Sequence, residues 1–432
     1  MTPMATQLSG AEFLAGRKTA LLADEPRVGK TGAALLAVEM VDAQKILIVT
    51  TTSGRAVWRK AIKDWILGAG QDFVIVSWDS LRNAKTYGEL SRQSFDLAIL
   101  DEDHRAKNPE TKTAQAIYGR FDRQGRRLSN GLSARADRVW HLTGTPLPHD
   151  PGDMWCRLRN SMPELLAQGK ELPDVTAFED FRARYCVVRM KQISNFRSIP
   201  VVIGGRNLPE LRTRLGDWML RRTQKDVGIR PPVRELMPLA ISAAQRKELA
   251  TDISVESVVS AIEQGRTKDL EMELGTLRRL TGRIKAEAVV SAAKEWLDDN
   301  PGDKLVLAYF HREVGDILED GLKDCCRVDG STSPTDRAAQ QEVFRSSGDH
   351  RIFLAQIDAC GEAIDLSAAP ELWFVEAVFS PKSMLQMSHR ISNVGQTKNT
   401  FIKVAMIEGS IDEAIQASLL RLWTSIKEVI NG

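Results

Sequence analysis

A lysine and two carboxylates, far apart along the chain, have the residue types that bind and hydrolyse a nucleotide. Lys30 lies between Gly29 and Thr31, after an apolar run at residues 20–23 and before a helix-favouring segment. Backbone N–H groups at such a helix start face an anion, the lysine brings positive charge to the outer phosphates, and the threonine hydroxyl is a ligand for Mg²⁺. The spacing predicts a phosphate-binding loop, although a strand, turn and helix that merely contain Gly-Lys-Thr would look the same.

The two carboxylates follow an apolar segment with the composition of a buried strand. Residues 95–100 lead directly into Asp101 and Glu102. A first carboxylate at the end of a strand can hold Mg²⁺, usually through water, and a second can orient or deprotonate the attacking water. We assign these two roles to Asp101 and Glu102 in that order.

Two further polar groups have residue types suited to a nucleotide or to phosphates. Gln7 has an amide that can donate to and accept from an adenine edge, although a solvent-facing glutamine is the simpler interpretation. Residues 45–50 are typical of a buried strand, and the hydroxyl run that follows can hold phosphates together with backbone N–H groups. That run is Thr51, Thr52 and Ser53. An ordinary polar loop with a helix cap fits this second pattern equally well.

These residues need a sheet that brings strand ends together. Apolar strand patterns alternate with helical patterns from residue 19 to residue 146, and the last of these strands, residues 139–142, leads into a tight turn with Gly144 and Thr145. Such alternation predicts a parallel α/β sheet, whose motifs meet at the carboxyl edge.

The composition is that of an ordinary globular protein. The chain has 432 residues, a net charge of +2 and five cysteines without CxxC spacing. The length predicts two or three domains, and the cysteine pattern argues against a disulfide framework or a zinc site and favours a reducing cytosol. No apolar run reaches the ~18 residues of a membrane span, and the first residues lack a secretory pattern, so no membrane contact is expected.

The order of the motifs resembles lobe one of a Snf2-type superfamily 2 ATPase or helicase. The most specific runs are DEDH with RAKNPETKTAQA behind it, and LTGTPLPHDPGDMW. The runs FRARYC and MLRRTQKDV resemble the linker between the lobes of that family, and their close spacing is most similar to the compact, annealing-helicase-like branch. Within the second of these runs, a structural role is the favoured interpretation for Arg221 and Arg222, with DNA contact as the alternative.

The later part of the chain resembles the second lobe of the same family. The run DGSTSPTDR and the helix between Gln386 and Gln396 are its marks. The resemblance implies an α/β fold of two RecA-like parallel-sheet lobes joined by a mostly helical connector. We expect lobe one at residues 1–160, the connector at 161–240 and lobe two at 241–432.

The resemblance also implies ATP and Mg²⁺ as cofactors and DNA as the partner. It places ATP at Gln7, Gly29, Lys30 and Thr31, and Mg²⁺ at Thr31 and Asp101. Catalysis would involve Lys30, Asp101, Glu102 and, from lobe two, Arg390. The residues expected to contact DNA are Thr51, Thr52, Ser53, Gly144, Thr145, Ser331, Thr332 and Gly361.

The function implied is ATP-dependent translocation on double-stranded DNA, or its remodelling, in replication, recombination or repair. The DNA would be duplex or branched and bound without sequence preference. No recognition module is evident beside the motor motifs, so a protein partner is expected to supply specificity. The expected location is the cytoplasm of a bacterium or a phage-infected host, or the nucleus if the source is eukaryotic.

The sequence departs from the family pattern where hydrolysis is completed. Asn393 stands where the family has a second arginine, and Ala363 and Asp365 replace a glycine and an asparagine. Either Arg390 suffices, another arginine such as Arg312 or Arg351 compensates, or hydrolysis is weak. The alternative function is therefore an ATP-binding, weakly hydrolysing DNA-binding protein or regulator.

Overall fold

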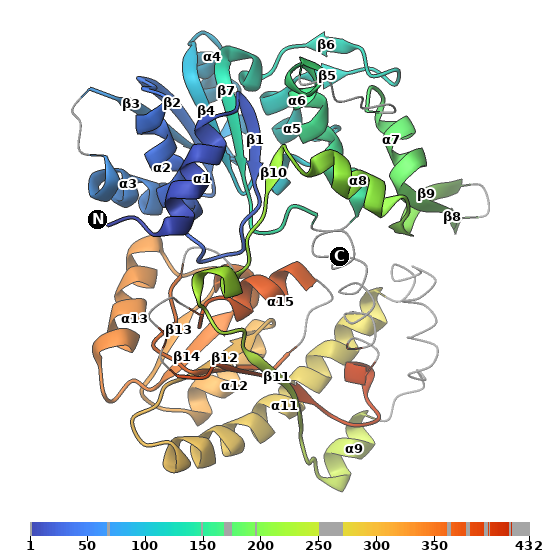
Figure 1. Cartoon of the computed structure of the whole chain (residues 1–432). Coiled ribbons are helices and arrows are strands. Elements are labelled where there is room, and N and C mark those ends of the chain that lie inside the picture. The colour runs from blue at the N-terminus through green and yellow to red at the C-terminus, as the bar shows by residue number, and fades with distance from the viewer. Residues whose placement is uncertain are drawn as a thin grey trace. The chain divides into compact units, whose positions relative to one another are not determined.

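The computed structural model describes most of the chain. The described residues are 2–66, 70–147, 150–167, 175–194, 197–249, 271–360, 364–376, 381–392, 396, 398–413 and 416. The contacts divide them into two units, and the boundary lies between Val227 and Gly228. Each unit is built around its own parallel sheet (Figure 1).

The sheet of the first unit has six strands in the order β10-β1-β7-β4-β2-β3, all paired in parallel. The strands are β1 (Thr19–Leu22), β2 (Lys45–Thr50), β3 (Asp72–Ser77), β4 (Phe95–Asp101), β7 (Ala136–Leu142) and β10 (Met219–Leu220). The near-continuous apolar runs of the inner strands are typical of strands that are buried on both faces. Because the strands are parallel, the ends of β1, β2, β4 and β7 share one edge.

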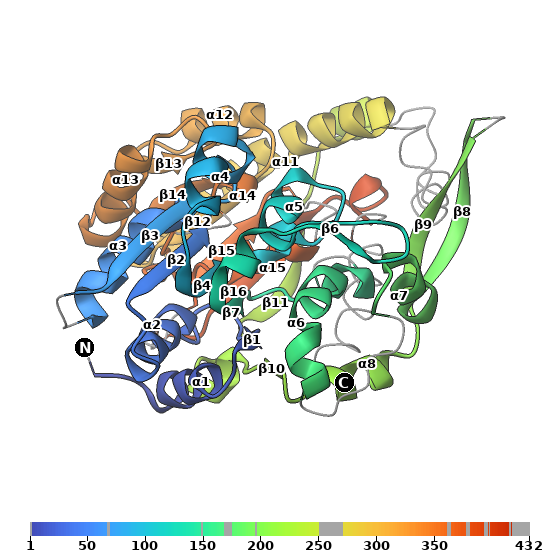
Figure 2. The same cartoon turned by 90° about the horizontal axis from the view of Figure 1, so that it is seen from above.

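Helices cover both faces of this sheet (Figure 2). Successive side chains of a strand point to opposite faces of the sheet. Leu22 and Ile48 pack with one set of helices, whereas Leu21 and Val49 pack with the other. The first face is covered by α1 (Ala5–Ala15), α2 (Lys30–Met40) and α3 (Gly54–Trp65). The second is covered by α4 (Ala84–Ser91), α5 (Lys112–Tyr118), α6 (Trp155–Ala167), α7 (Phe178–Tyr185) and α8 (Leu208–Leu215).

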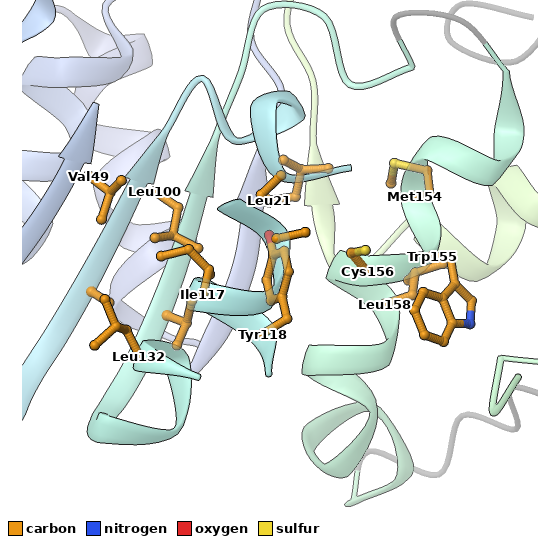
Figure 3. Close-up of a cluster of buried hydrophobic side chains, with 14 of the residues drawn as sticks. Leu21, Val49, Leu100, Ile117, Tyr118, Leu132, Met154, Trp155, Cys156 and Leu158 are labelled. Atoms are coloured by element: carbon orange, nitrogen blue, oxygen red, sulfur yellow. The ribbon is translucent and has the colours of Figure 1, made fainter. Parts of the chain in front are cut away.

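The core on the second face joins the sheet to the helices that follow β4 and β7. Figure 3 shows Leu21, Val49 and Leu100 of the strands beside Ile117 of α5, with Leu158 of α6 in the same cluster. This packing fixes α6 against the sheet.

The connecting segment also contains strands. β8 (Cys186–Ser194) and β9 (Arg197–Gly205) form an antiparallel pair between α7 and α8, and β10 joins the sheet of the first unit. α7 ends where Val187 and Val188 begin a β-branched run, which favours a strand. The remaining short elements are β5 (Arg120–Phe121), β6 (Arg127–Ser129) and 3₁₀ helices at Ser80–Arg82, Asp103–Ala106, Leu132–Arg135, Pro151–Met154 and Gln224–Val227.

The second unit repeats the plan with the strand order β11-β16-β15-β12-β14-β13, again all parallel. Its strands are β11 (Val233–Pro238), β12 (Leu305–Tyr309), β13 (Cys325–Val328), β14 (Ile352–Gln356), β15 (Glu371–Phe374) and β16 (Phe401–Met406). Its helices are α9 (Ala243–Leu249), α11 (Glu271–Asp299), α12 (Arg312–Gly321), α13 (Pro334–Ser346), α14 (Ile357–Cys360) and α15 (Pro381–Ser388).

Residues of α12 and the middle of α11 pack on one face of this second sheet, and residues of α13, α14 and α15 pack on the other together with Leu277 near the start of α11. The two parallel six-stranded sheets with helices confirm the predicted fold class of two RecA-like lobes. Among the described residues, no helix is both long and apolar enough to span a membrane.

Candidate nucleotide site

The loop between β1 and α2 has the conformation that its single glycine allows. Gly29 is the N-cap of α2 and has φ of 101°, in the left-handed region that glycine enters freely. A Cβ at Gly29 would approach Cγ and Nε2 of Gln7 to 2.9 Å. Arg27 is also left-handed, with φ of 73°, which costs a residue with a Cβ about 1 kcal/mol. Conformation and space therefore both require glycine at position 29, whereas Arg27 is held under strain.

Lys30 is enclosed by the loop that precedes it. Its Nζ donates to the backbone oxygens of Asp24 at 2.7 Å and Glu25 at 3.2 Å. Burial lowers the pKa of Lys30, and the negative charges of Glu102, Asp24 and Asp101 oppose that shift. The fold therefore brings Lys30 close enough to both predicted catalytic carboxylates for their charges to matter.

Asp101 is oriented by donors from two other elements. Its Oδ2 accepts from Thr50 Oγ1 at 2.7 Å and from Trp58 Nε1 at 2.9 Å, and its backbone oxygen accepts from Trp78 Nε1 at 2.8 Å. Burial, and then the charge of Glu102, raise the pKa of Asp101 to about 6, while the two side-chain donors lower it. Hydrogen-bond donors of this kind orient carboxylates that bind metal ions.

Glu102 links the end of β4 to the turn after β7. It has φ of 54°, which is unusual for a residue with a side chain and is often found at functional sites. Its Oε2 lies 3.1 Å from His104 Nδ1 and accepts from Thr143 Oγ1 at 3.4 Å, and these two partners are 3.2 Å apart. The backbone N–H of Thr145 donates to Thr143 Oγ1 at 3.1 Å. The predicted water-orienting carboxylate is therefore in contact with the predicted DNA-binding turn.

A segment almost 200 residues later in the chain braces the loop. Asp24 accepts at Oδ1 from the backbone N–H of Arg222 at 2.9 Å and from its Nε at 3.0 Å. Glu25 accepts from Arg221 Nη2 at 3.2 Å and from the backbone N–H of Gln224 at 2.8 Å. These contacts agree with the structural role predicted for Arg221 and Arg222. Sequence reasoning missed the acidic side of the pairing, for which the only signal was the opposite charge of the two runs.

Gln7 lies against the start of α2. It is 7% exposed, and its Oε1 accepts from the backbone N–H of Met4 at 2.9 Å. A Cβ at Gly32 would come within 2.4 Å of Gln7 Nε2. The solvent-facing interpretation of Gln7 is therefore wrong, because two glycines make room for its side chain beside the loop. Its contact with an adenine stays a prediction.

The hydroxyl run after β2 is partly used by the protein itself. Thr51 is buried, and its Oγ1 accepts from the backbone N–H of Gly54 at 3.0 Å and lies 3.2 Å from Ser53 Oγ. Thr52 is exposed. The alternative of a polar loop that caps a helix therefore applies to Thr51, whereas DNA contact by any residue of the run stays a prediction.

The turn after β7 approaches the phosphate loop closely. A Cβ at Gly144 would lie 3.0 Å from Cδ of Pro26, so a larger residue would displace the loop or the turn. Thr145 is 7% exposed, and its Oγ1 has no hydrogen-bond partner among the described residues. Close packing against Pro26 therefore favours glycine at position 144. The DNA contact of Gly144 stays a prediction.

In the second unit, the predicted DNA-binding hydroxyls form a local turn at the end of β13. Ser331 Oγ donates to Asp329 Oδ1 at 2.6 Å, and Thr332 Oγ1 accepts from the backbone N–H of Asp329 at 3.0 Å. Ser331 remains exposed. Gly361 lies outside the described residues.

Arg390 follows α15 and donates to backbone oxygens of its own unit. Its Nε reaches the oxygen of Gln386 at 3.2 Å and its Nη1 that of Ile364 at 3.5 Å. Asp365 Oδ1 accepts from the backbone N–H of Ser367 at 3.1 Å. Ala363 and Asn393 lie outside the described residues.

The two arginines considered as substitutes differ in position. Arg312 follows β12 at the carboxyl edge of the sheet, is exposed, and lies 3.7 Å from Asp329 Oδ2. Arg351 precedes β14 at the opposite edge, where it donates to the backbone oxygens of Asp303 at 2.9 Å and Leu297 at 3.0 Å. Arg351 therefore has a structural role within its own unit, whereas Arg312 remains exposed at the carboxyl edge of the second sheet.

Comparison with known proteins matches two family models to the chain. Residues 44–281 match the SNF2-related domain, and residues 287–395 match the helicase conserved C-terminal domain. The chain is 25% identical over 441 residues to the human DNA annealing helicase and endonuclease ZRANB3. This alignment covers 95% of this chain and 39% of the relative. A second relative is the SWI/SNF-related matrix-associated actin-dependent regulator of chromatin subfamily A-like protein 1 of Xenopus tropicalis. The two are 25% identical over 448 residues, and the alignment covers 99% of this chain and 44% of the relative.

The chain thus spans less than half the length of these two curated relatives. A solved structure, the Sulfolobus solfataricus SWI2/SNF2 ATPase core in complex with dsDNA, aligns over 100% of this chain and 97% of its own with 15% identity and a TM-score of 0.42. The SNF2-related domain match alone covers more than half of the chain. The chain belongs to the SNF2-related family.

Proposed function

We propose that the chain is an ATP-dependent translocase on double-stranded DNA, a remodelling helicase of the Snf2 type that acts in replication, recombination or repair. One observation carries the proposal: in a member of this family, the fold groups Lys30 with the carboxylates of Asp101 and Glu102. The relatives named as annealing helicases support duplex or branched DNA as the partner.

The proposal assigns ATP and Mg²⁺ to the edge of the first sheet. Lys30 would hold the outer phosphates, Thr31 and Asp101 would hold the metal, and Glu102 would orient the attacking water. Gln7 would contact the adenine beside Gly29. Mg²⁺, when bound, neutralises charge that develops on the phosphates. The arrangement of Asp101 suits a cation, because two donors already fix its Oδ2.

DNA would be held by hydroxyls and backbone N–H groups, which read the phosphate backbone and not the bases. The proposed contacts are Thr51, Thr52, Ser53, Gly144, Thr145, Ser331, Thr332 and Gly361. The net charge of +2 gives no general attraction to DNA, so these local groups would have to supply binding, and a protein partner would supply specificity. Arg390 would contribute to hydrolysis from the second unit.

A second function is favoured by the residues that depart from the family pattern. With Asn393, Ala363 and Asp365 in place of the usual residues, the chain would bind ATP and DNA but hydrolyse ATP slowly. An arginine that reaches the transferred phosphate raises the rate by about 10³ to 10⁵ in other NTPases, and asparagine cannot replace its charge.

Phosphate release separates the two functions. The rate is measured without DNA and with duplex, forked, four-way-junction and single-stranded DNA. The translocase proposal predicts that duplex or branched DNA raises the rate at least about tenfold. ATP binding without any stimulation would reject it in favour of the weakly hydrolysing protein.

The variant Asn393→Arg tests whether the missing arginine limits turnover. A sharp rise in turnover would identify Asn393 as the cause of slow hydrolysis. Ser346→Arg is the matched control, because it adds the same charge at an exposed position at the end of α13 in the same unit. An equal rise in both variants would point to general attraction of the anionic substrates.

A further inference from the structure

Three ionisable side chains lie completely buried behind Glu102. Asp103, His141 and Arg157 are each 0% exposed. His141 Nδ1 and Arg157 Nε lie 2.9 Å and 2.7 Å from the same oxygen, Oδ2 of Asp103. We call these three residues the buried ionic cluster. Charged groups in the interior pay a large desolvation penalty, and apolar residues of similar size usually serve stability as well.

The buried ionic cluster joins three elements that surround the nucleotide site. Asp103 directly follows Glu102, His141 is in β7 two residues before Thr143, and Arg157 is in α6. Arg157 Nη1 also donates to the backbone oxygen of Pro146 at 2.5 Å. One guanidinium therefore holds both the segment after β4 and the turn after β7.

The hydrogen bonding of the cluster is incomplete. Among the residues that the structure describes, Asp103 Oδ1, His141 Nε2 and Arg157 Nη2 are buried without a hydrogen-bond partner. Arg157 Nε is paired with Asp103 Oδ2 by charge at 2.7 Å but lacks the geometry of a hydrogen bond. Unmet buried polar atoms reduce stability, so stability alone does not explain this arrangement. What the cluster does provide is a fixed distance between two segments that carry the predicted chemistry.

We propose that Arg157 is a positioning residue for the site around Glu102, and this inference rests on the proposed function. By binding Asp103 and the carbonyl of Pro146 together, Arg157 keeps Thr143 Oγ1 within 3.4 Å of Glu102 Oε2. Because Arg157 is completely buried, it would act through these partners and not by contact with ATP or DNA. It thereby couples the nucleotide site to the turn that contains Gly144 and Thr145.

Arginine suits this task because its planar guanidinium presents several donors in fixed directions. Lysine at position 157 keeps a positive charge beside Asp103, but its compact ammonium group lacks the separate, fixed donors of a guanidinium. We therefore expect Arg157→Lys to preserve the ion pair and to lose the simultaneous contact with Pro146.

The test compares Arg157→Lys with Arg159→Met. Arg159 lies on the same helix and donates to the backbone oxygen of Gly125 at 3.0 Å. Its contacts within the described part of the chain do not include the buried ionic cluster. Two readouts are taken: kcat and KM for ATP with saturating duplex DNA, and the hydrogen-exchange rate of the Thr145 amide, which donates to Thr143 Oγ1. The first depends on hydrolysis and the second does not.

Arg157→Lys is expected to lower kcat by about 10²-fold with little change in KM, since a small misplacement of a catalytic group has an effect of that size. The Thr145 amide should exchange about tenfold faster, as for the loss of its one hydrogen bond to the Thr143 hydroxyl. Arg159→Met should change neither. Equal values of kcat and of Thr145 exchange in the two variants would overturn the proposal.

The double variant Asp103→Ala with Arg157→Met distinguishes positioning from charge balance. It leaves no buried charge uncompensated, yet the contact with Pro146 is gone, so kcat should remain low. Full recovery of kcat would show that Arg157 only neutralises Asp103. If wild-type protein shows no DNA-stimulated hydrolysis, the proposed function fails, and Thr145 exchange still decides the role of Arg157.

Discussion

Replacing Arg222 by methionine tests how the phosphate loop is held. Methionine keeps much of the length of the side chain and removes the guanidinium that pairs with Asp24. Asp24 is 0% exposed, and Arg222 is 12% exposed. The backbone N–H of Arg222 would still donate to Asp24 Oδ1, so one partner of the carboxylate survives the change.

The size of the effect follows from the burial of the partner. Removing one member of a buried ion pair costs about 3 to 5 kcal/mol, because the other charge is left uncompensated. We expect the lower end, about 3 kcal/mol, since one backbone donor remains. Arg221 provides a matched comparison: it is also 12% exposed, but its partner Glu25 is 20% exposed. Arg221→Met should cost about 1 kcal/mol, because water can solvate Glu25.

Urea unfolding of the two variants, followed by tryptophan fluorescence, measures this difference in the free energy of unfolding. The KM for ATP should rise more in Arg222→Met, because the carbonyl of Asp24 is one of the two acceptors of Lys30. Asp24→Asn combined with Arg222→Met should recover part of the lost stability. A loss in Arg221→Met that equals or exceeds that in Arg222→Met would refute the reasoning from burial.

Three further predictions concern Asp101 and Arg27. Asp101→Asn should raise the free energy of unfolding at pH 7 by about 3 kcal/mol, since ionisation of a carboxyl whose pKa is raised from 3.8 to about 6 opposes folding. Thermal unfolding should show this gain fading as the pH falls toward 4. Trp58→Phe removes a donor that lowers the pKa of Asp101, so the acid limb of kcat/KM for ATP should move up by about one pH unit. Trp78→Phe is the control: it removes a hydrogen bond to the backbone oxygen of Asp101, and the acid limb should stay in place. Arg27→Gly should raise the unfolding free energy in urea by about 0.5 kcal/mol, because glycine adopts the left-handed backbone without strain and gives back part of that gain as unfolded-state entropy.

Local patterns in the sequence were sufficient to predict the fold and to predict that the main site residues lie together. The apolar run before Asp101 and the run before Gly29 had the composition of buried strands, and parallel pairing then brings their carboxyl ends to one edge. That is why Lys30 could be placed with the carboxylates although the sequence separates them widely. The family resemblance, carried by the runs around Asp101 and Gly144, is confirmed by the matching domain models.

The contacts that depend on tertiary packing could not be predicted from those patterns. The pairing of Asp24 with Arg222 joins residues of two different segments, and nothing local to either identifies its partner. The burial of Asp103 with Arg157 is a second case, because an acidic residue in a polar run and an arginine in a helix are both usually exposed. Gln7 is a third, since its burial depends on the absence of side chains at the glycines of α2.

The most direct test of the central claim is DNA-stimulated phosphate release by wild-type protein and by Lys30→Ala, with nucleotide binding measured in parallel. If Lys30 serves the ATP site of a DNA-dependent motor, duplex DNA should stimulate the wild type, and the variant should lose at least about 10²-fold of the stimulated rate while its unfolding transition is retained. Hydrolysis by Lys30→Ala at the wild-type rate would contradict the assignment of the site, and wild-type protein that binds ATP without responding to any DNA would contradict the motor.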